Sequence, residues 1–134
     1  MSMNKAFAIF GSLAVAIAVI SGLYIGGSPG EQRLLRFDER RVEDLRVLSR
    51  AIERRWNRTE LLPQELEELV DGQRLGSIPL DPKTGLGYVY ESISINAYRL
   101  CADFSKSAVK PQTNDFWAHE SGYQCFEFTL VNQR

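Results

Sequence analysis

Hydrophobic and polar positions divide the chain into an apolar first segment and a mixed remainder. The segment from Ala6 to Ile25 contains no charged residue, and a helix of its 20 residues rises about 30 Å, the thickness of the hydrocarbon core of a bilayer. Tyr24 lies at its far end, where an aromatic ring suits the membrane interface. The pattern predicts a transmembrane helix over this segment and a flexible Gly-rich break at 26–30. Residues 1–5 form the N-terminus, which the membrane topology derived below from the cysteines assigns to the cytoplasm.

A cleaved signal peptide is the alternative interpretation of the same segment. The apolar core of a signal peptide has about 7–15 residues, fewer than the run in this chain, and no small-x-small cleavage site follows the run. Both differences favour a helix that is retained as an anchor.

A helical periodicity follows the break. After Leu34, apolar residues recur from Val42 onward at steps of three and four, at Leu45, Leu48, Ile52 and Trp56. Arg, Glu and Asp occupy the other positions, so we predict one long amphipathic helix over 31–58 with a solvated, charged face. A nucleic-acid-binding face is not indicated because acidic residues interleave with the arginines.

Turn-forming residues separate this helix from the second half of the chain. Residues 57–62 are predicted to form a turn, and Pro63 suits the first position of a short second helix. Its apolar side would be formed by the Leu and Val residues within 66–70, and Asp71-Gly72 would end it. The following segment, 78–85, contains two prolines, an Asp and a Gly, which predicts a rigid turn.

Three later segments have the character of β-strands. Residues 88–90 have high β propensity, whereas 97–104 and 123–131 alternate between apolar and polar positions. The inward positions would be Tyr98, Leu100, Ala102 and Phe104 on the second strand, and Phe126, Phe128 and Leu130 on the third. We therefore expect an α+β protein, in which a long amphipathic helix packs on a small antiparallel sheet after an N-terminal transmembrane helix.

Two cysteines, Cys101 and Cys125, lie on the polar faces of the last two predicted strands. If the strands pair antiparallel with these residues opposite each other, three further pairs match: Arg99 with Glu127, Leu100 with Phe126, and Tyr98 with Phe128. This register predicts a disulfide that would stabilise the domain by about 3–4 kcal/mol. An offset register stays open, because directly cross-strand bridges can be strained. Two unrelated free thiols are the alternative.

The flanking charges and the cysteines give opposite indications of membrane topology. Lys5 precedes the apolar segment, whereas Arg33, Arg36, Arg40 and Arg41 follow it, and basic residues mark the cytoplasmic side of short loops. A disulfide instead requires an oxidising compartment, which in a bacterium is the periplasm. Because the charge rule weakens for large translocated segments, we predict a single-pass protein of the inner (cytoplasmic) membrane with its C-terminal domain in the periplasm.

The composition gives little support for catalysis or nucleic-acid binding. The chain has 16 Lys and Arg against 17 Asp and Glu, whereas nucleic-acid-binding domains carry a basic excess. His119 is the only histidine, so neither a catalytic triad nor a zinc site is indicated. Asp81, Asp103 and Asp115 lack EF-hand spacing. We therefore predict no enzymatic activity, no metal or cofactor, no nucleic-acid partner and no small-molecule substrate.

The stretch from Asn114 to His119 is the most unusual part of the polar loop at 105–122. It contains two adjacent aromatic residues, Phe116 and Trp117. In one interpretation these side chains fold back and cap the small core. In the other, Phe116, Trp117 and His119 form a partner-binding edge, because exposed aromatic residues anchor interfaces.

The order of the predicted elements is distinctive. An apolar N-terminal helix precedes an amphipathic helix, a short Leu/Glu helix, the element Ile78-Pro79-Leu80-Asp81-Pro82, an aromatic strand and a small antiparallel sheet. This order resembles the type II secretion pseudopilins and the wider type IV pilin-like group. The major pseudopilin has a similar Leu-Pro-x-Asp-Pro turn before Gly-x-Pro-Tyr-x-Tyr, where this chain has Gly85-Leu86-Gly87-Tyr88-Val89-Tyr90. The resemblance covers about residues 40 to 104 and implies a pseudopilin-like soluble domain at 31–134.

Pilin-like proteins also carry a processing site, with Gly followed by Phe or Met and a Glu at the fifth mature position. The first 25 residues contain no Glu, and Gly11-Ser12 lies within the apolar run. The calcium-binding loop of the major pseudopilin is also not recognisable around Asp103 and Asp115. We therefore expect a permanent, unprocessed anchor.

The resemblance implies a non-enzymatic protein that acts in protein–protein assembly of a secretion or pilus-type system. Its partners would be the lipid bilayer and other membrane proteins. The missing processing motif favours a second interpretation, an accessory single-pass subunit of another membrane complex, respiratory or photosynthetic.

Overall fold

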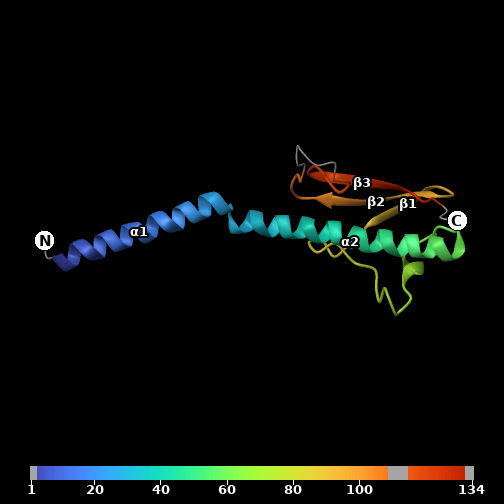
Figure 1. The fold of residues 1–134 in the computed structure, drawn as a ribbon, viewed down its shortest axis with the longest axis horizontal. Helices are drawn as coiled ribbons and strands as arrows, with labels where there is room; N and C mark the ends of the chain where they lie inside the picture. Colours follow the sequence, from blue (N-terminus) through green and yellow to red (C-terminus); the bar gives the residue numbers. More distant parts are fainter. Residues whose placement is uncertain (1–2, 109–114, 132–134) are drawn as a thin grey trace. The chain divides into compact units, whose positions relative to one another are not determined.

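The computed structural model describes residues 3–108 and 115–131, which form two long helices, a short 3₁₀ helix and a three-stranded antiparallel sheet (Figure 1). In chain order the elements are α1 (Met3–Gly26), α2 (Pro29–Thr59), η1 (Leu66–Leu69), β1 (Val89–Ser94), β2 (Ala97–Phe104) and β3 (Gly122–Thr129). The expected α+β class is confirmed. The chain divides into two units, Met1–Arg33 and Leu34–Arg134.

α1 is an apolar helix near the N-terminus, as the uncharged run predicted. Its 24 residues extend about 36 Å, and it is long and apolar enough to span a membrane. The helix ends at Gly26, and the next residue, Gly27, has a φ of 73°, which a residue without a Cβ adopts at no steric cost.

The predicted break at 26–30 is shorter in the structure. Ser28 Oγ accepts a hydrogen bond of 3.2 Å from the backbone N–H of Glu31, which makes Ser28 the N-cap of α2. Pro29 and Gly30 already belong to α2, because the fixed φ of proline suits the first helical position.

α2 provides one side of the core of the second unit. Leu45, Leu48 and Ile52 are fully buried and Trp56 is 6% exposed, so the predicted apolar stripe is confirmed. The helix ends at Thr59 and therefore includes the first residues of the predicted turn at 57–62.

The sheet has the strand order β1-β2-β3 and provides the other side of the core. On β2, the alternation places Tyr98, Leu100, Ala102 and Phe104 inward, and all four are buried. β2 and β3 pair in the predicted register, with Leu100 opposite Phe126 and Tyr98 opposite Phe128. The same register places Cys101 opposite Cys125 without an offset. The two form the predicted disulfide, with Cα atoms 4.0 Å apart.

The charged pair predicted across β2 and β3 forms elsewhere. Arg99 does lie opposite Glu127, but its Nη2 donates to Glu91 of β1 at 2.7 Å. β1 pairs with the other edge of β2 and places Glu91 opposite Arg99 as well. The guanidinium therefore has a carboxylate on both neighbouring strands and bonds to the one on β1.

The region after α2 contains less helix than predicted. η1 has four residues, and it begins at Leu66 rather than at Pro63. Leu66 and Leu69 are buried as expected, whereas Val70 is 42% exposed. Pro63 is instead tied to the sheet, because its carbonyl accepts a hydrogen bond of 2.8 Å from the Tyr90 hydroxyl.

Candidate functional site

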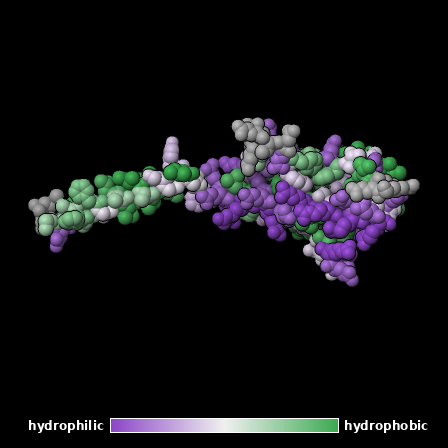
Figure 2. Space-filling model, in the orientation of Figure 1, coloured by the Kyte–Doolittle hydropathy of each residue, from purple (hydrophilic) through white to green (hydrophobic). Residues whose placement is uncertain are grey.

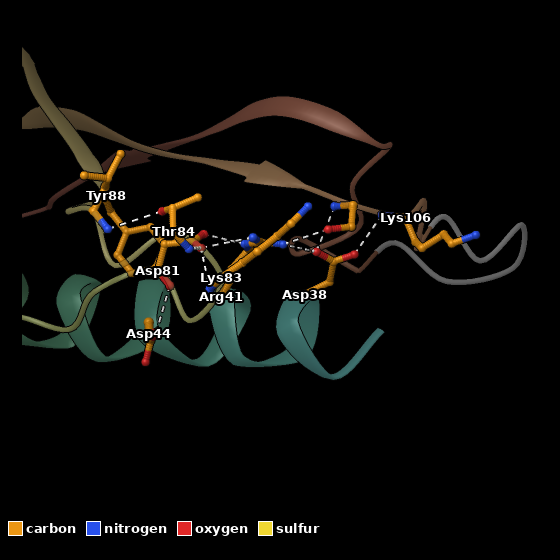
Figure 3. A network of polar contacts seen from close by, with 10 residues as sticks. Asp38, Arg41, Asp44, Asp81, Lys83, Thr84, Tyr88 and Lys106 are labelled. Carbon is orange, nitrogen blue, oxygen red and sulfur yellow. Dashed lines mark hydrogen bonds and ion pairs between the residues drawn. The ribbon is translucent and has the colours of Figure 1, made fainter. Parts of the chain in front are cut away.

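A buried ionic network joins α2 to the turn at residues 78–85 (Figure 3). Arg41, which is 2% exposed, donates from Nε and Nη2 to the two carboxylate oxygens of Asp81, at 2.5 and 3.1 Å. Its Nη1 donates to Asp38 at 2.6 Å and to the hydroxyl of Ser105 at 3.1 Å. A forked guanidinium–carboxylate contact combines strength with a fixed geometry. One side chain of α2 thus joins three segments that are far apart in the sequence.

Asp38 fixes the chain where it leaves β2. Its two carboxylate oxygens accept the backbone N–H groups of Ser105 and Lys106 at 2.9 and 2.8 Å. These are the first residues after the end of the strand at Phe104. The carboxylate of α2 therefore satisfies backbone donors that the sheet no longer pairs.

Asp81 organises the predicted rigid turn. Its Oδ1 accepts the backbone N–H groups of Lys83 and Thr84 at 2.8 and 2.9 Å, and its carbonyl accepts the N–H of Gly85 at 2.8 Å. Gly85 has a φ of 70°, a conformation that favours glycine. The segment between α2 and β1 is therefore held in one shape by the same carboxylate that binds Arg41.

A second buried carboxylate, Asp44, lies one helical turn further along α2. The Tyr88 hydroxyl donates to its Oδ2 at 2.8 Å, and Arg40 Nε lies 3.3 Å from its Oδ1. Asp44 is 4% exposed and Tyr88 is 8% exposed. This contact ties α2 to the residue that immediately precedes β1.

Two residues of the network, Arg41 and Asp81, have pKa values that are shifted away from neutrality. Burial lowers the pKa of Arg41, but the hydrogen bonds and charges of Asp81 and Asp38 together raise it by more. The pKa of Arg41 is therefore above its ordinary value. Burial would raise the pKa of Asp81, but Arg41 and the turn N–H groups lower it to about 2. Arg41 and Asp81 therefore stay ionised near neutral pH.

The Asp44–Tyr88 pair shifts in the opposite sense. Burial raises the pKa of Asp44, which the Tyr88 hydrogen bond only partly opposes. Burial and the nearby carboxylate of Asp44 both raise the pKa of Tyr88. The phenol therefore remains protonated and serves as a permanent hydrogen-bond donor.

The geometry of the network supports a positioning role rather than proton transfer. A general acid or base works best with a pKa near the operating pH, and Arg41 and Asp81 are shifted away from it. Both carboxylates that flank Arg41 already accept backbone donors as well. The network holds the turn and the end of β2 against α2.

The burial of this network was not predicted, because the charged residues of α2 were expected to face solvent. The sequence did contain a signal. Asp38 and Arg41 fall between Leu34 and Leu45 at steps of four, three and four, which is the spacing of the apolar stripe. Polar residues that continue an apolar periodicity are candidates for buried pairs.

A groove of about 520 Å³ lies beside the network, and Arg41, Asp81, Leu86, Val89 and Tyr123 are among its lining residues. Arg41 and Asp81 are bound to each other there. The groove thus contains a buried ion pair whose hydrogen-bonding groups are already engaged.

The segment at 115–119, which we call the aromatic loop, lies against the sheet. The ring centroids of Trp117 and Phe126 are 5.0 Å apart, and those of Phe116 and Phe128 are 5.1 Å apart. The guanidinium of Arg46 lies 5.5 Å from the Trp117 ring centroid, within the range of a cation–π contact. Trp117 is half-buried, whereas Phe116 is 52% exposed. Phe116 therefore touches the core and still presents half of its surface.

His119 is buried rather than available at the surface. It is 5% exposed, and its ring lies 3.8 Å from that of Phe104. Nδ1 lies 3.0 Å from the carbonyl of Trp117, which places the proton on Nδ1. Nε2 has no hydrogen-bond partner among the residues that the structure describes. A partner-binding role for Phe116, Trp117 and His119 stays a prediction, and Asn114 lies outside the described residues.

The three aspartates considered for a cation lie apart in different environments. Asp81 belongs to the Arg41 network, and Asp103 is exposed on β2. Asp115 accepts the backbone N–H of Trp117 at 3.0 Å. Within 3–108 and 115–131, no group of three or more His, Cys, Asp or Glu residues has the arrangement of a metal site.

Comparison of the chain with protein-family models, with curated proteins and with solved structures finds no match.

Proposed function

We propose that this chain is a non-enzymatic, membrane-anchored protein with a pseudopilin-like domain in the periplasm. In this proposal it acts in protein–protein assembly of a secretion or pilus-type system. The domain contributes surfaces that bind other membrane proteins, and α1 anchors it in the inner membrane.

The observation that carries this proposal is the attachment of the turn to α2 through Arg41 and Asp81. The turn is the part of the sequence that resembles the pseudopilins most closely. In the structure its Asp binds the long helix at 2.5 Å and 3.1 Å. Of the aromatic residues that follow, Tyr88 bonds to Asp44 of α2, and Tyr90 bonds to the carbonyl of Pro63 in the loop after α2. A resemblance in sequence thus coincides with the contacts that hold helix and sheet together.

The disulfide supports the periplasmic side of the membrane. Cys101 and Cys125 are joined, and such bonds persist in oxidising compartments. By the positive-inside rule, the arginines that follow α1 indicate the opposite topology. The periplasmic location of the C-terminal domain is therefore part of the proposal.

A second candidate function is an accessory subunit of another membrane complex, respiratory or photosynthetic. It is favoured by the first 25 residues, which contain neither the processing Gly nor the Glu typical of pilin-like proteins. In this alternative α1 is a permanent docking helix.

Photo-crosslinking from the aromatic loop in native membranes would distinguish the two. The variant Phe116→p-benzoylphenylalanine keeps an aromatic ring at a position that is 52% exposed. After irradiation the full chain is purified in mild detergent, and its adducts are identified by mass spectrometry. Adducts with secretion or pilus-type components support the first function, whereas adducts with a respiratory or photosynthetic complex contradict it and support the second.

Tyr123 provides the matched control position. It is an aromatic residue of β3, 60% exposed, and it lies on the polar side of the strand, away from Phe126 and Phe128. The variant Tyr123→p-benzoylphenylalanine should give a different set of adducts. Identical adducts from both positions would contradict a specific interface at the aromatic loop.

A further inference from the structure

The face of α2 opposite the core carries a row of arginines. With 100° per residue, six arginines fall within an arc of about 120°, centred opposite Leu45, Leu48 and Ile52. We call this row the arginine stripe; it consists of Arg36, Arg40, Arg46, Arg50, Arg54 and Arg58. From Arg36 to Arg58 the helix rises about 33 Å, and hydrophilic side chains cover α2 along its length (Figure 2).

The stripe retains a positive charge after its internal pairing. Only two glutamates, Glu39 and Glu43, lie on the same arc, so six positive and two negative charges give +4. Glu43 is shared by Arg46 at 3.6 Å and Arg50 at 4.0 Å. Arg40 pairs with Asp44, but its side chain remains 68% exposed.

Three members of the stripe have no acidic partner in the described part of the chain. Arg36, Arg54 and Arg58 form no ion pair with residues 3–108 or 115–131. The neighbouring Arg55 differs, because it lies off the stripe and binds Glu68 at 2.5 Å. The stripe therefore has guanidinium groups available for an external anion.

The stripe lacks the apolar anchors that protein interfaces use. Leu35 is the only large hydrophobic residue of α2 that is exposed, and by helical periodicity it lies outside the arc. Tight protein interfaces are built around buried aromatic or aliphatic residues, whereas binding to lipid headgroups requires only charge near the surface. A stripe with a net positive charge and no exposed large hydrophobic residue fits an anionic headgroup layer better than a folded partner.

The connection between α1 and α2 would keep the stripe close to the headgroups of a membrane that α1 spans. Only two residues separate the end of α1 at Gly26 from the start of α2 at Pro29, so the beginning of α2 stays within about 10 Å of the end of the apolar helix. A tether of this length gives a high effective concentration of headgroups.

We propose that the arginine stripe binds the phosphate groups of anionic phospholipids at the surface of the membrane that α1 spans. Each net charge near such a surface favours the bound state by about fivefold. The four net charges therefore make the bound state predominate at low ionic strength, and added salt weakens it.

Arginine footprinting on the full chain tests this proposal. The chain is reconstituted into lipid nanodiscs of phosphatidylcholine alone, or of phosphatidylcholine mixed with phosphatidylglycerol, and treated with phenylglyoxal. The modification rate of each arginine is read by mass spectrometry, with Arg74, which is exposed and outside α2, as the internal reference. We expect the stripe arginines to react severalfold more slowly in the anionic discs, and salt to restore their rates.

Paired charge reversals provide the matched control. Arg50→Glu with Arg54→Glu lowers the charge of the stripe from +4 to zero and should remove the lipid-dependent protection of the other four arginines. Arg74→Glu with Lys83→Glu changes the net charge of the chain equally and should leave that protection intact. Because this control removes Arg74, Arg99 of β2 serves as its internal reference. Equal rates in both lipid compositions overturn the proposal, as does protection that depends on protein density alone, which would indicate a second copy of the chain as the occupant.

Discussion

Replacing Asp81 with Asn tests whether the ionic network stabilises the domain through charge. Asn keeps the side-chain oxygen that accepts the turn N–H groups of Lys83 and Thr84 but removes the negative charge that Arg41 binds. The pKa of Asp81 is lowered from 3.8 to about 2, and one pKa unit corresponds to about 1.4 kcal/mol. The ionised carboxylate therefore stabilises the folded state by about 2 kcal/mol, which Asp81→Asn should remove at neutral pH.

The pH dependence has a definite sign. Because the pKa of Asp81 is lower in the folded state, its contribution is complete above pH 4 and is lost as the pH falls from about 4 to about 2. Asp44 acts at higher pH, because burial raises its pKa and the folded state therefore binds a proton at pH values above the ordinary pKa of an aspartate. Acidification should therefore first stabilise the domain through Asp44 and then destabilise it through Asp81.

Urea denaturation of the full chain in detergent micelles measures these effects. Both tryptophans of the chain, Trp56 and Trp117, lie in the second unit, so their fluorescence reports its unfolding and is not affected by α1. A loss of about 2 kcal/mol lowers the urea midpoint by about 1–2 M. The variant should lose the acid-dependent step below pH 4, whereas Asp103→Asn, at an exposed position of β2, should behave as wild type. A variant that follows the wild-type curve from pH 7 to pH 2 would refute the reasoning.

Three further predictions concern the disulfide, the second buried carboxylate and the N-terminus. Cys101 and Cys125 should resist maleimide in the native protein until a reductant is added, and the reduced domain should be about 3 kcal/mol less stable; labelling without reduction would contradict the periplasmic assignment. Tyr88→Phe removes the donor to buried Asp44 and should lower the free energy of unfolding by about 1–3 kcal/mol, measured by the same urea titration. Tyr90→Phe removes a hydrogen bond that is only partly buried and should lower the free energy of unfolding by less. Equal losses in the two variants would contradict a special role for Asp44. N-terminal sequencing should find an unshortened, unmethylated chain; a processed N-terminus would disprove the permanent anchor.

The sheet and the long helix could be predicted from the sequence because their residues repeat with the period of the element. Alternation assigned the inner residues of β2 correctly, and one register brought Cys101 opposite Cys125 together with two apolar pairs. The predicted position of Arg99 opposite Glu127 is also confirmed, but β2 has two neighbouring strands, and the guanidinium bonds to the other one. Arg99 found Glu91 on β1, whose register could not be derived from two aromatic residues.

The ionic network could not be predicted because its members are distant in sequence and individually ordinary. Arg41 and Asp81 are separated by 40 positions, and nothing local shows that a turn will fold back onto the helix. The burial of Arg41 depends on Asp38 of the same helix and on Asp81 of the distant turn, since an unpaired buried charge would be strongly destabilising. Only the continuation of the apolar spacing through Asp38 and Arg41 marked these positions.

The position of Asp38 and Arg41 on α2 also determines how the domain bears mechanical tension. Any pull on α1 reaches the second unit through the first turns of α2, and the first buried side chains along that path are these two. The hydrogen bonds of Arg41 to Asp81, and of Asp38 to the N–H groups of Ser105 and Lys106, are therefore loaded first. The apolar contacts of Leu45 and Leu48 are loaded after them. Since protonation of Asp81 weakens the clamp, the force needed to peel α2 from the sheet should fall in acid, although the apolar core behind it is unchanged.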